Sequence, residues 1–368
     1  MPKILHAADL HLVRNGEDCN YGLAVLNEII SIANSRYATH LLICGDMFNS
    51  FADYSDASLL AEVKESFSRL SENCHVIYIT GNHELLGKSH NERLSAYNFG
   101  NVSVISDSME FINIGGIEIA AVPFRRDYKY LLSEDFPRKY AFRILMMHGI
   151  DSTIYAGPDT EMEDGLDGGA QIPDIIISRS QADYAAFGHI HSSHQAMSGN
   201  VPAVYPGSSR VWRRGETGPR KIVMFNTDGY NAGPRQEIII SSAGQYRQFT
   251  MPVNIDGSFP QAKADEIISL AEQFPIDWFE IVFSGTIEDA NSFEERKAAF
   301  HAVLSKKLRK CTLDTSDINT FSALSDNPAA RVFLEAMDAK RPPEGTPQFN
   351  IWLQARKIGL EEINKAVR

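Results

Sequence analysis

Five apolar segments of this sequence each end in residues that can bind a metal ion. The residues that follow these segments are Asp9 and His11, Asp46, Asn82 and His83, His148, and His189 and His191. Apolar runs of about four to eight residues bounded by glycine or polar residues are typical of buried strands. Because ligands gather at the carboxyl ends of strands in layered α/β folds, these side chains are expected to lie close together.

The residue types favour a site for two divalent metal ions. Two cations about 3.5–4 Å apart can hold both the attacking and the leaving oxygen of a phosphoryl transfer, and a shared carboxylate screens their mutual repulsion. Mixed imidazole and carboxylate ligands suit manganese, iron or zinc, whereas magnesium and calcium prefer oxygen ligands. Water at such ions loses a proton near neutral pH and becomes the nucleophile. The sequence therefore predicts a two-metal hydrolase, and no Gly-x-Ser-x-Gly segment indicates a serine nucleophile.

In their order and spacing, the five blocks resemble the calcineurin-like metallophosphoesterase superfamily. The resemblance implies two metal sites that share one bridging carboxylate, Asp46. The implied ligands are Asp9, His11, Asp46 and His191 for the first site, and Asp46, Asn82, His148 and His189 for the second. It also implies that His83 contacts the scissile phosphate and can protonate the leaving oxygen. Two divalent ions are expected as cofactors, with manganese favoured and iron or zinc as alternatives.

Three further stretches resemble one branch of that superfamily. Residues 4–12, residues 183–191 and the turn at 205–208 with 221–223 are similar to the DNA repair exonuclease branch, the SbcD-type nuclease subunits of the bacterial double-strand-break repair complex. The resemblance implies DNA as the substrate and a coiled-coil ATPase subunit as a partner, and a homodimer is left open. One position departs from the pattern, because Asn49 stands where the branch usually has a histidine that helps to position the substrate phosphate.

A short basic strip follows the last predicted ligands. Its members, interpreted as substrate-binding residues, are Arg210, Trp212, Arg213 and Arg214. Arginines interleaved with an aromatic side chain can hold a phosphate backbone and stack a base. The formal net charge of −12 argues against a surface that coats nucleic acid generally, so any such binding must be local.

Length and composition set the frame for the fold. A chain of 368 residues exceeds one typical core, so two domains are expected. The four cysteines form no Cys-x-x-Cys pair, and no apolar segment reaches signal-peptide or membrane-spanning length. Reduced thiols and a cytoplasmic location without membrane attachment are the resulting expectations.

The first 245 residues are predicted to form the phosphoesterase domain. Strands alternate with helices expected at residues 21–37, 55–70 (with Ser55 or Asp56 as the N-cap) and 91–99. Closely spaced short strands follow, with a hairpin turn at Gly115–Gly116. Two mixed sheets packed face to face and flanked by helices are the simplest arrangement. It agrees with the four-layer α/β/β/α sandwich that the resemblance implies.

Residues 246–318 are predicted to form a small α/β cap domain, and residues 319–368 a linker and helical tail. The cap follows a connection at 241–248 and contains helices at 261–274 and 292–310, a strand at 278–286 and a short strand at 311–313. The tail helix, 349–367, places apolar residues on one side: Phe349, Trp352, Leu353, Leu360 and Ile363. This side can dock on its own domain or on a partner. The resemblance favours a partner, the ATPase subunit.

Three classes of function remain open at this stage. A DNA exonuclease or endonuclease subunit is favoured by the motif context and the three-part order of the chain. A phosphoesterase acting on a small nucleotide, lipid or protein phosphate is the alternative, supported by Asn49 and the negative charge. A non-catalytic adaptor is disfavoured, because a degenerate scaffold would not retain the complete ligand set together with His83.

Overall fold

The computed structural model describes residues 1–85, 101–157, 170–288, 290–320, 328–343 and 346–367. The helix predicted at 91–99 lies outside these residues. The chain divides after Gln245 into two compact units, Met1–Gln245 and Tyr246–Arg368, which are described separately.

Unit 1 contains two six-stranded mixed sheets, as the sequence predicts. The first has the order β12-β11-β1-β2-β3-β4, with β1 (Lys3–Ala7), β2 (His40–Cys44), β3 (His75–Ile79), β4 (Val102–Ile105), β11 (Lys221–Asn226) and β12 (Gln236–Ile239). The second has the order β5-β6-β7-β8-β10-β9, with β5 (Glu110–Ile114), β6 (Ile117–Ala121), β7 (Phe142–His148), β8 (Tyr184–Gly188), β9 (His194–Ser198) and β10 (Val201–Tyr205). Strands β1, β2 and β3 run parallel, and so do β7 and β8.

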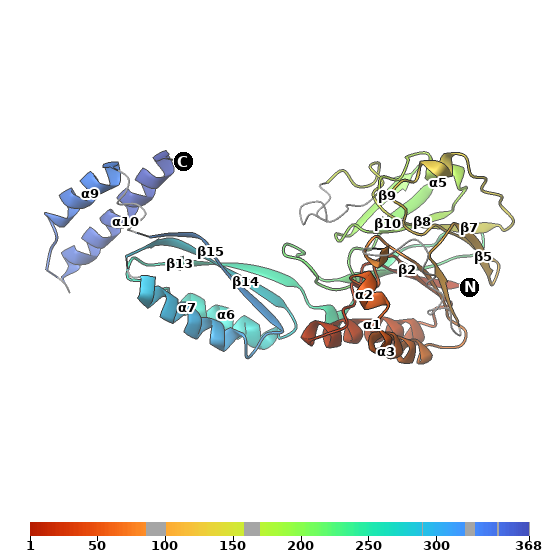
Figure 1. The fold of residues 1–368 in the computed structure, drawn as a ribbon, viewed down its shortest axis with the longest axis horizontal. Coiled ribbons are helices and arrows are strands. Elements are labelled where there is room, and N and C mark those ends of the chain that lie inside the picture. Colours follow the sequence, from red (N-terminus) through yellow and green to blue (C-terminus); the bar gives the residue numbers. More distant parts are fainter. Residues whose placement is uncertain (86–100, 158–169, 289, 321–327, 344–345, 368) are drawn as a thin grey trace. The chain divides into compact units, whose positions relative to one another are not determined.

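The core of unit 1 has three layers of apolar side chains. Between the sheets, alternate residues of both, such as Ile77 and Ile144, form one buried cluster. Helices α1 (Glu17–Ser35) and α3 (Ala57–Ser68) pack on the outer face of the first sheet (Figure 1). The outer face of the second sheet is covered, among the described residues, by loops and the short helices η3 (Lys129–Leu132) and α5 (Ile176–Arg179). The fourth layer predicted as helical is therefore largely irregular there.

Local signals explain where several elements of unit 1 begin. Asp56 caps α3, because its Oδ1 accepts hydrogen bonds from the backbone N–H groups of Ser58 and Leu59 at 3.1 and 2.9 Å. Gly115 and Gly116 have φ of 62° and 85° in the turn that joins β5 to β6, which confirms the predicted hairpin. The other helical turns among the described residues of the unit are α2 (Phe51–Tyr54), η1 (His83–Leu85) and η4 (Ser241–Ala243).

Unit 2 begins with three parallel strands in the order β13-β14-β15. They are β13 (Tyr246–Val253), β14 (Trp278–Ile287) and β15 (Lys310–Thr320), and helices α6 (Gln261–Gln273) and α7 (Ala290–Leu304) lie on one face of the sheet (Figure 1). Two predictions were wrong here. The segment predicted as a connection contains the start of β13, an edge strand that tolerates Pro252. The strand predicted at 311–313 is longer, because its polar continuation keeps pairing with β14.

Two helices end the chain, α9 (Pro328–Asp338) and α10 (Pro347–Val367), of which the sequence predicted only the second. Trp352 and Leu360 of α10 are buried, and the Trp352 indole N–H donates to the carbonyl of Met337 at 2.8 Å. Leu360 packs with Ala330 of α9. The apolar side of α10 therefore packs on α9, and Tyr246–Arg368 cluster as one compact unit. Among the helices described, none has the length and apolar content to cross a membrane.

Candidate metal centre

The predicted ligands follow the carboxyl ends of five strands, β1, β2 and β3 in the first sheet and β7 and β8 in the second. Because neighbouring strands in each set run parallel, their carboxyl ends meet at one edge. Within the first sheet, the segments after β1 and β2 are joined by backbone hydrogen bonds, since Asp9 N–H donates to the Gly45 carbonyl at 3.1 Å and His11 N–H to the Asp46 carbonyl at 2.9 Å. The two edges are joined where the backbone N–H of His189, after β8, donates to Oδ1 of Asp9 at 3.0 Å. Side chains far apart in the sequence are thus brought to one place.

The backbone at the ligands is held in an unusual conformation. Among the described residues, six that are not glycine have positive φ, and four of them are predicted ligands: Asp9, His11, Asp46 and His189, with φ of 54°, 47°, 47° and 94°. Each such residue costs about 1–3 kcal/mol, so it persists only where the surroundings enforce it and where its side chain is needed. The strain marks these positions as functional rather than structural.

Two glycines leave the space that the ligands occupy. A Cβ atom on Gly45 would lie 2.0 Å from Nδ1 of His148, and one on Gly81 would lie 2.1 Å from Oδ1 of Asp46. Both contacts are far inside van der Waals distance and involve buried groups that cannot move away. The glycines of the Gly-Asp and Gly-Asn-His blocks therefore have a packing reason that their sequence alone does not reveal.

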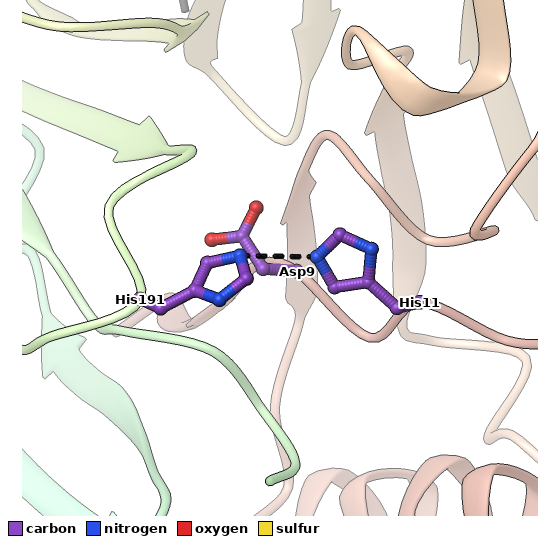
Figure 2. A group of neighbouring side chains, drawn as sticks. All are labelled: Asp9, His11 and His191. Atoms are coloured by element: carbon purple, nitrogen blue, oxygen red, sulfur yellow. Dashed lines mark hydrogen bonds between the residues drawn. The ribbon is translucent and has the colours of Figure 1, made fainter. Parts of the chain in front are cut away.

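Asp9, His11 and His191 point toward one another in the first site (Figure 2). Their candidate ligand atoms all lie within 4.8 Å of one another, and Nε2 of His11 lies 3.0 Å from Nε2 of His191. Nδ1 of His191 is 2.5 Å from Oε1 of Glu216. A carboxylate can only accept, so Nδ1 of a neutral His191 carries the proton and Nε2 presents a lone pair to the site.

The second site also brings buried carboxylate and imidazole groups together, from other residues. Asp46, His148 and His189 again place ligand atoms within 4.8 Å of one another. Nδ1 of His148 donates to the Cys44 carbonyl at 2.9 Å, so Nε2 of the neutral ring has only a lone pair. That nitrogen lies 2.9 Å from Oδ1 of Asn82 and 3.1 Å from Oδ2 of Asp46. Three such acceptor atoms repel one another unless a proton on Nε2 or a metal ion lies between them, so the residues fit a metal ion that takes the place of that proton.

The electrostatics of the two sites agree with this. Burial lowers the pKa of His148, but the charge and hydrogen bond of Asp46, together with the charge of Asp9, outweigh burial and raise it to about 10. Burial raises the pKa of Asp9 to about 6. Burial, followed by the charges of His83 and His191, holds the pKa of His11 well below its usual value. The buried carboxylates thus draw positive charge into the site, and a divalent cation supplies it.

His83 lies beside the two sites rather than within the predicted ligand set. Nδ1 of its ring donates to the Asn49 carbonyl at 2.7 Å, and its backbone N–H donates to Oδ1 of Asp46 at 3.0 Å. Its ring packs edge-on against that of His11, with centroids 4.6 Å apart. Since Nδ1 is committed to Asn49, Nε2 is the nitrogen for proton exchange with a substrate. Asn49 therefore acts here through its backbone.

The structure divides the predicted basic strip into two pairs. Arg210 is fully buried, and its guanidinium donates to the carbonyls of His11 at 2.5 Å and Asp18 at 2.9 Å. The structure therefore gives the predicted substrate contact of Arg210 no support, because its charge stabilises the backbone of a ligand loop.

Trp212 also departs from the prediction. Its ring stacks on His11 with the planes 8° apart and the centroids at 5.6 Å, rather than offering a stacking platform to solvent. Arg213 is half-buried and Arg214 exposed, and both line a pocket of about 630 Å³ that His191 also lines.

Two carboxylates that sequence reasoning missed support the ligands. Glu84 is fully buried and accepts hydrogen bonds from the backbone N–H of Phe48 at 2.9 Å, that of Gly81 at 2.7 Å and the hydroxyl of Tyr78 at 2.7 Å. It fixes the loop that carries Asn82, and its place directly after His83 was the available signal. Glu216, the partner of His191, lies 25 residues further along the chain, in the loop between β10 and β11. Nothing in the sequence pattern indicated its role.

Comparison with known proteins agrees with this geometry. Residues 2–193 match the calcineurin-like phosphoesterase family, and the chain belongs to that family. A curated relative is the uncharacterized metallophosphoesterase YhaO of Bacillus subtilis (strain 168), 28% identical over 256 residues. The match covers 60% of this chain and 56% of the relative, so the chain spans little more than half of that protein's length.

Solved structures similar to this chain include two at low sequence identity. One is purple acid phosphatase PPD1 from yellow lupin (Lupinus luteus) seeds, with a TM-score of 0.43, 12% identity, and coverage of 67% of this chain and 52% of the other. The second is the phosphopantetheinyl hydrolase PptH of Mycobacterium tuberculosis, with a TM-score of 0.37, 14% identity, and coverage of 64% and 95%. Family membership and the buried His/Asp groups together make this chain a metal-dependent phosphoesterase.

Proposed function

We propose that this chain is a phosphodiesterase that cuts DNA, the nuclease subunit of a cytoplasmic double-strand-break repair complex. The observation that carries the proposal is the pair Arg213 and Arg214, which line the pocket of about 630 Å³ shared with the ligand His191. Guanidinium groups next to a phosphoryl-transfer site suit a polyanionic substrate, since each can hold a phosphate of the chain on either side of the scissile bond. The sequence blocks that resemble the repair exonucleases support the same substrate class.

The residues of the chain divide the work of the reaction. Two divalent ions, when bound, would polarise the phosphoryl oxygens and supply an activated water near neutral pH. Asp9, His11, Asp46 and His191 would hold one ion, and Asp46, Asn82, His148 and His189 the other. His83 donates from Nδ1 to the Asn49 carbonyl, so it acts as the acid in its doubly protonated form, in which Nε2 also carries a proton and passes it to the leaving oxygen.

A smaller phosphoester is the second candidate, and two observations favour it. The carbonyl of Asn49 is used to orient His83, and no histidine stands at that position to hold a second phosphate. The net charge of −12 also opposes the approach of a long polyanion.

One comparative assay separates these candidates. Manganese-loaded protein is tested on single-stranded and double-stranded oligonucleotides, a chromogenic phosphodiester, a chromogenic monoester and cyclic nucleotides. Turnover of oligonucleotides that falls in Arg214→Ala but not in Lys263→Ala, a half-exposed lysine of unit 2, supports the DNA substrate. Turnover of cyclic nucleotides or the monoester alone would replace DNA by a small substrate.

For the ATPase partner we propose the exposed side of α10. Its buried side docks on α9, but Ile351 and Ile358, two turns apart, are 68% and 59% exposed. Amphipathic helices commonly dock through apolar residues at such spacing. The double substitution Ile351→Glu/Ile358→Glu should spare phosphodiesterase activity and abolish co-purification with the ATPase subunit. Val303→Glu, on an exposed position of α7, is the control. If the double substitution instead removes a dimer on gel filtration, the exposed side of α10 mediates self-association.

A further inference from the structure

His191 is held by a buried carboxylate. Oε1 of Glu216 lies 2.5 Å from Nδ1 of His191, and both side chains are at most 7% exposed. A carboxylate that accepts the outer N–H of a ligand histidine fixes the tautomer and the ring orientation, and it makes the inner nitrogen a stronger donor to a cation. The pair therefore has the geometry of an outer support for a metal ligand.

The segment around Glu216 holds the backbone as well as the side chain of this ligand. The second oxygen of Glu216 accepts the backbone N–H of Trp212 at 2.7 Å, and the Trp212 ring stacks on His11. Arg220 donates to the carbonyl of His191 at 3.2 Å. One short loop thus fixes two ligands of the first site, and Glu216 is the group that joins the loop to His191.

The outer support of the second site differs in the part of the chain that the structure describes. The buried carboxylate of Glu84 holds the backbone of the Asn82 loop rather than a ligand side chain. The outer nitrogen of His148 meets the neutral backbone carbonyl of Cys44. Inside the sites, Asp9 belongs to the first alone, Asp46 is shared, and the second adds the uncharged Asn82. The first site therefore gathers more negative charge than the second, so the two are expected to bind cations with different affinities.

We propose that Glu216 is a positioning residue that orients His191 and tightens cation binding at the first site over the second. This rests on the proposed two-metal function, because it assigns a support to one of the two sites.

The variant Glu216→Gln tests the proposal without changing the size of the side chain. A carboxylate accepts both the His191 and the Trp212 protons, whereas the amide accepts with its oxygen only and turns a donor toward the other group. Metal-free protein is titrated with Mn²⁺ in a calorimeter. Glu216→Gln should weaken one of two binding events by about 10–100-fold and leave the other unchanged. His191→Ala should affect the same event, and Asn82→Ala the other one.

The control is Glu237→Gln, which removes the same charge from an exposed carboxylate paired with Lys221. It should leave both events and the melting temperature unchanged. If Glu216→Gln does not fold, Glu216→Asp keeps the charge but withdraws it by one methylene, and an intermediate loss at the same event is expected.

Normal affinity at both sites in a folded Glu216 variant would overturn the inference and leave the proposed function standing. Equal weakening of both events would also overturn it, since a general loss of structure would produce that result. Failure of the unchanged protein to bind two ions would instead overturn the proposed function itself.

Discussion

Replacing His83 by alanine tests the proposed proton transfer directly. Because Nδ1 of His83 donates to the Asn49 carbonyl, the proton for the leaving oxygen is the one that Nε2 carries when the ring is doubly protonated. Alanine removes that proton. It keeps the backbone N–H of residue 83, which lies 3.0 Å from Oδ1 of Asp46 and helps to fix the bridging carboxylate. Metal content should therefore stay unchanged while the rate falls.

The size of the fall follows from the role. General acid catalysis contributes about 10²–10⁴-fold to a rate. At about 1.36 kcal/mol for each factor of ten, this corresponds to about 2.7–5.4 kcal/mol in the activation free energy. We expect His83→Ala to lower kcat by this factor on a phosphodiester with an alkyl leaving group. A nitrophenyl ester should lose less, since its leaving oxygen departs readily without a proton.

The assay compares kcat on both substrates with the metal content of the purified variant. His301→Ala, on α7 of unit 2, is the control and should match the unchanged protein. Equal losses on the two substrates would show that His83 binds the phosphate instead of donating a proton. Loss of metal would make it a ligand, an alternative that the structure itself raises, because ligand atoms of His11, Asp46 and His83 lie within 4.8 Å of one another.

Four further results are expected. Asp46→Asn should abolish turnover and normal two-metal binding by calorimetry while keeping the fold by circular dichroism, because asparagine tolerates the φ of 47° at this position. Arg210→Met should lower the free energy of unfolding in urea by about 3 kcal/mol or more, since two carbonyls lose a charged donor. Arg214→Ala should leave it unchanged but make oligonucleotide binding less salt-dependent. Chelation should lower the melting temperature, and Mn²⁺ should restore it. At a hundredfold excess over Kd, each bound ion should add about 2.7 kcal/mol to the free energy of unfolding. An unchanged melting temperature would contradict the metal assignment.

The metal centre could be predicted from the sequence because the residue types that bind metals stand directly after the apolar runs that form strands. A metal ligand must be one of a few residue types, and the end of a buried apolar run fixes its place on the sheet. Asp9 and His148 could therefore both be predicted as ligands from the sequence, although 139 positions separate them. Gly45 and Gly81 belong to the same blocks, but only the structure shows why they are glycines. A Cβ atom at either position would lie within about 2.2 Å of a ligand side chain.

The interior roles of charged residues could not be predicted in the same way. From the sequence, Arg210 is expected at the surface, because arginine is seldom fully buried. Its burial depends on carbonyls of two loops that the sequence does not show to be adjacent. In unit 2, β15 is largely polar and only half-buried, so its strand character comes from pairing with β14 rather than from its own pattern. Long-range pairing decides such segments.

The strained backbone joins these observations into one argument. Asp9, Asp46 and His189 have positive φ where glycine would relieve about 1–3 kcal/mol at each. The fold maintains that strain through groups that bind no substrate, such as the Arg210 guanidinium on the His11 carbonyl. Strained backbone and buried carboxylates both weaken the metal-free fold. Divalent cations among the carboxylates and imidazoles would offset that cost, so the features that weaken the metal-free fold are those that prepare the site for its reaction.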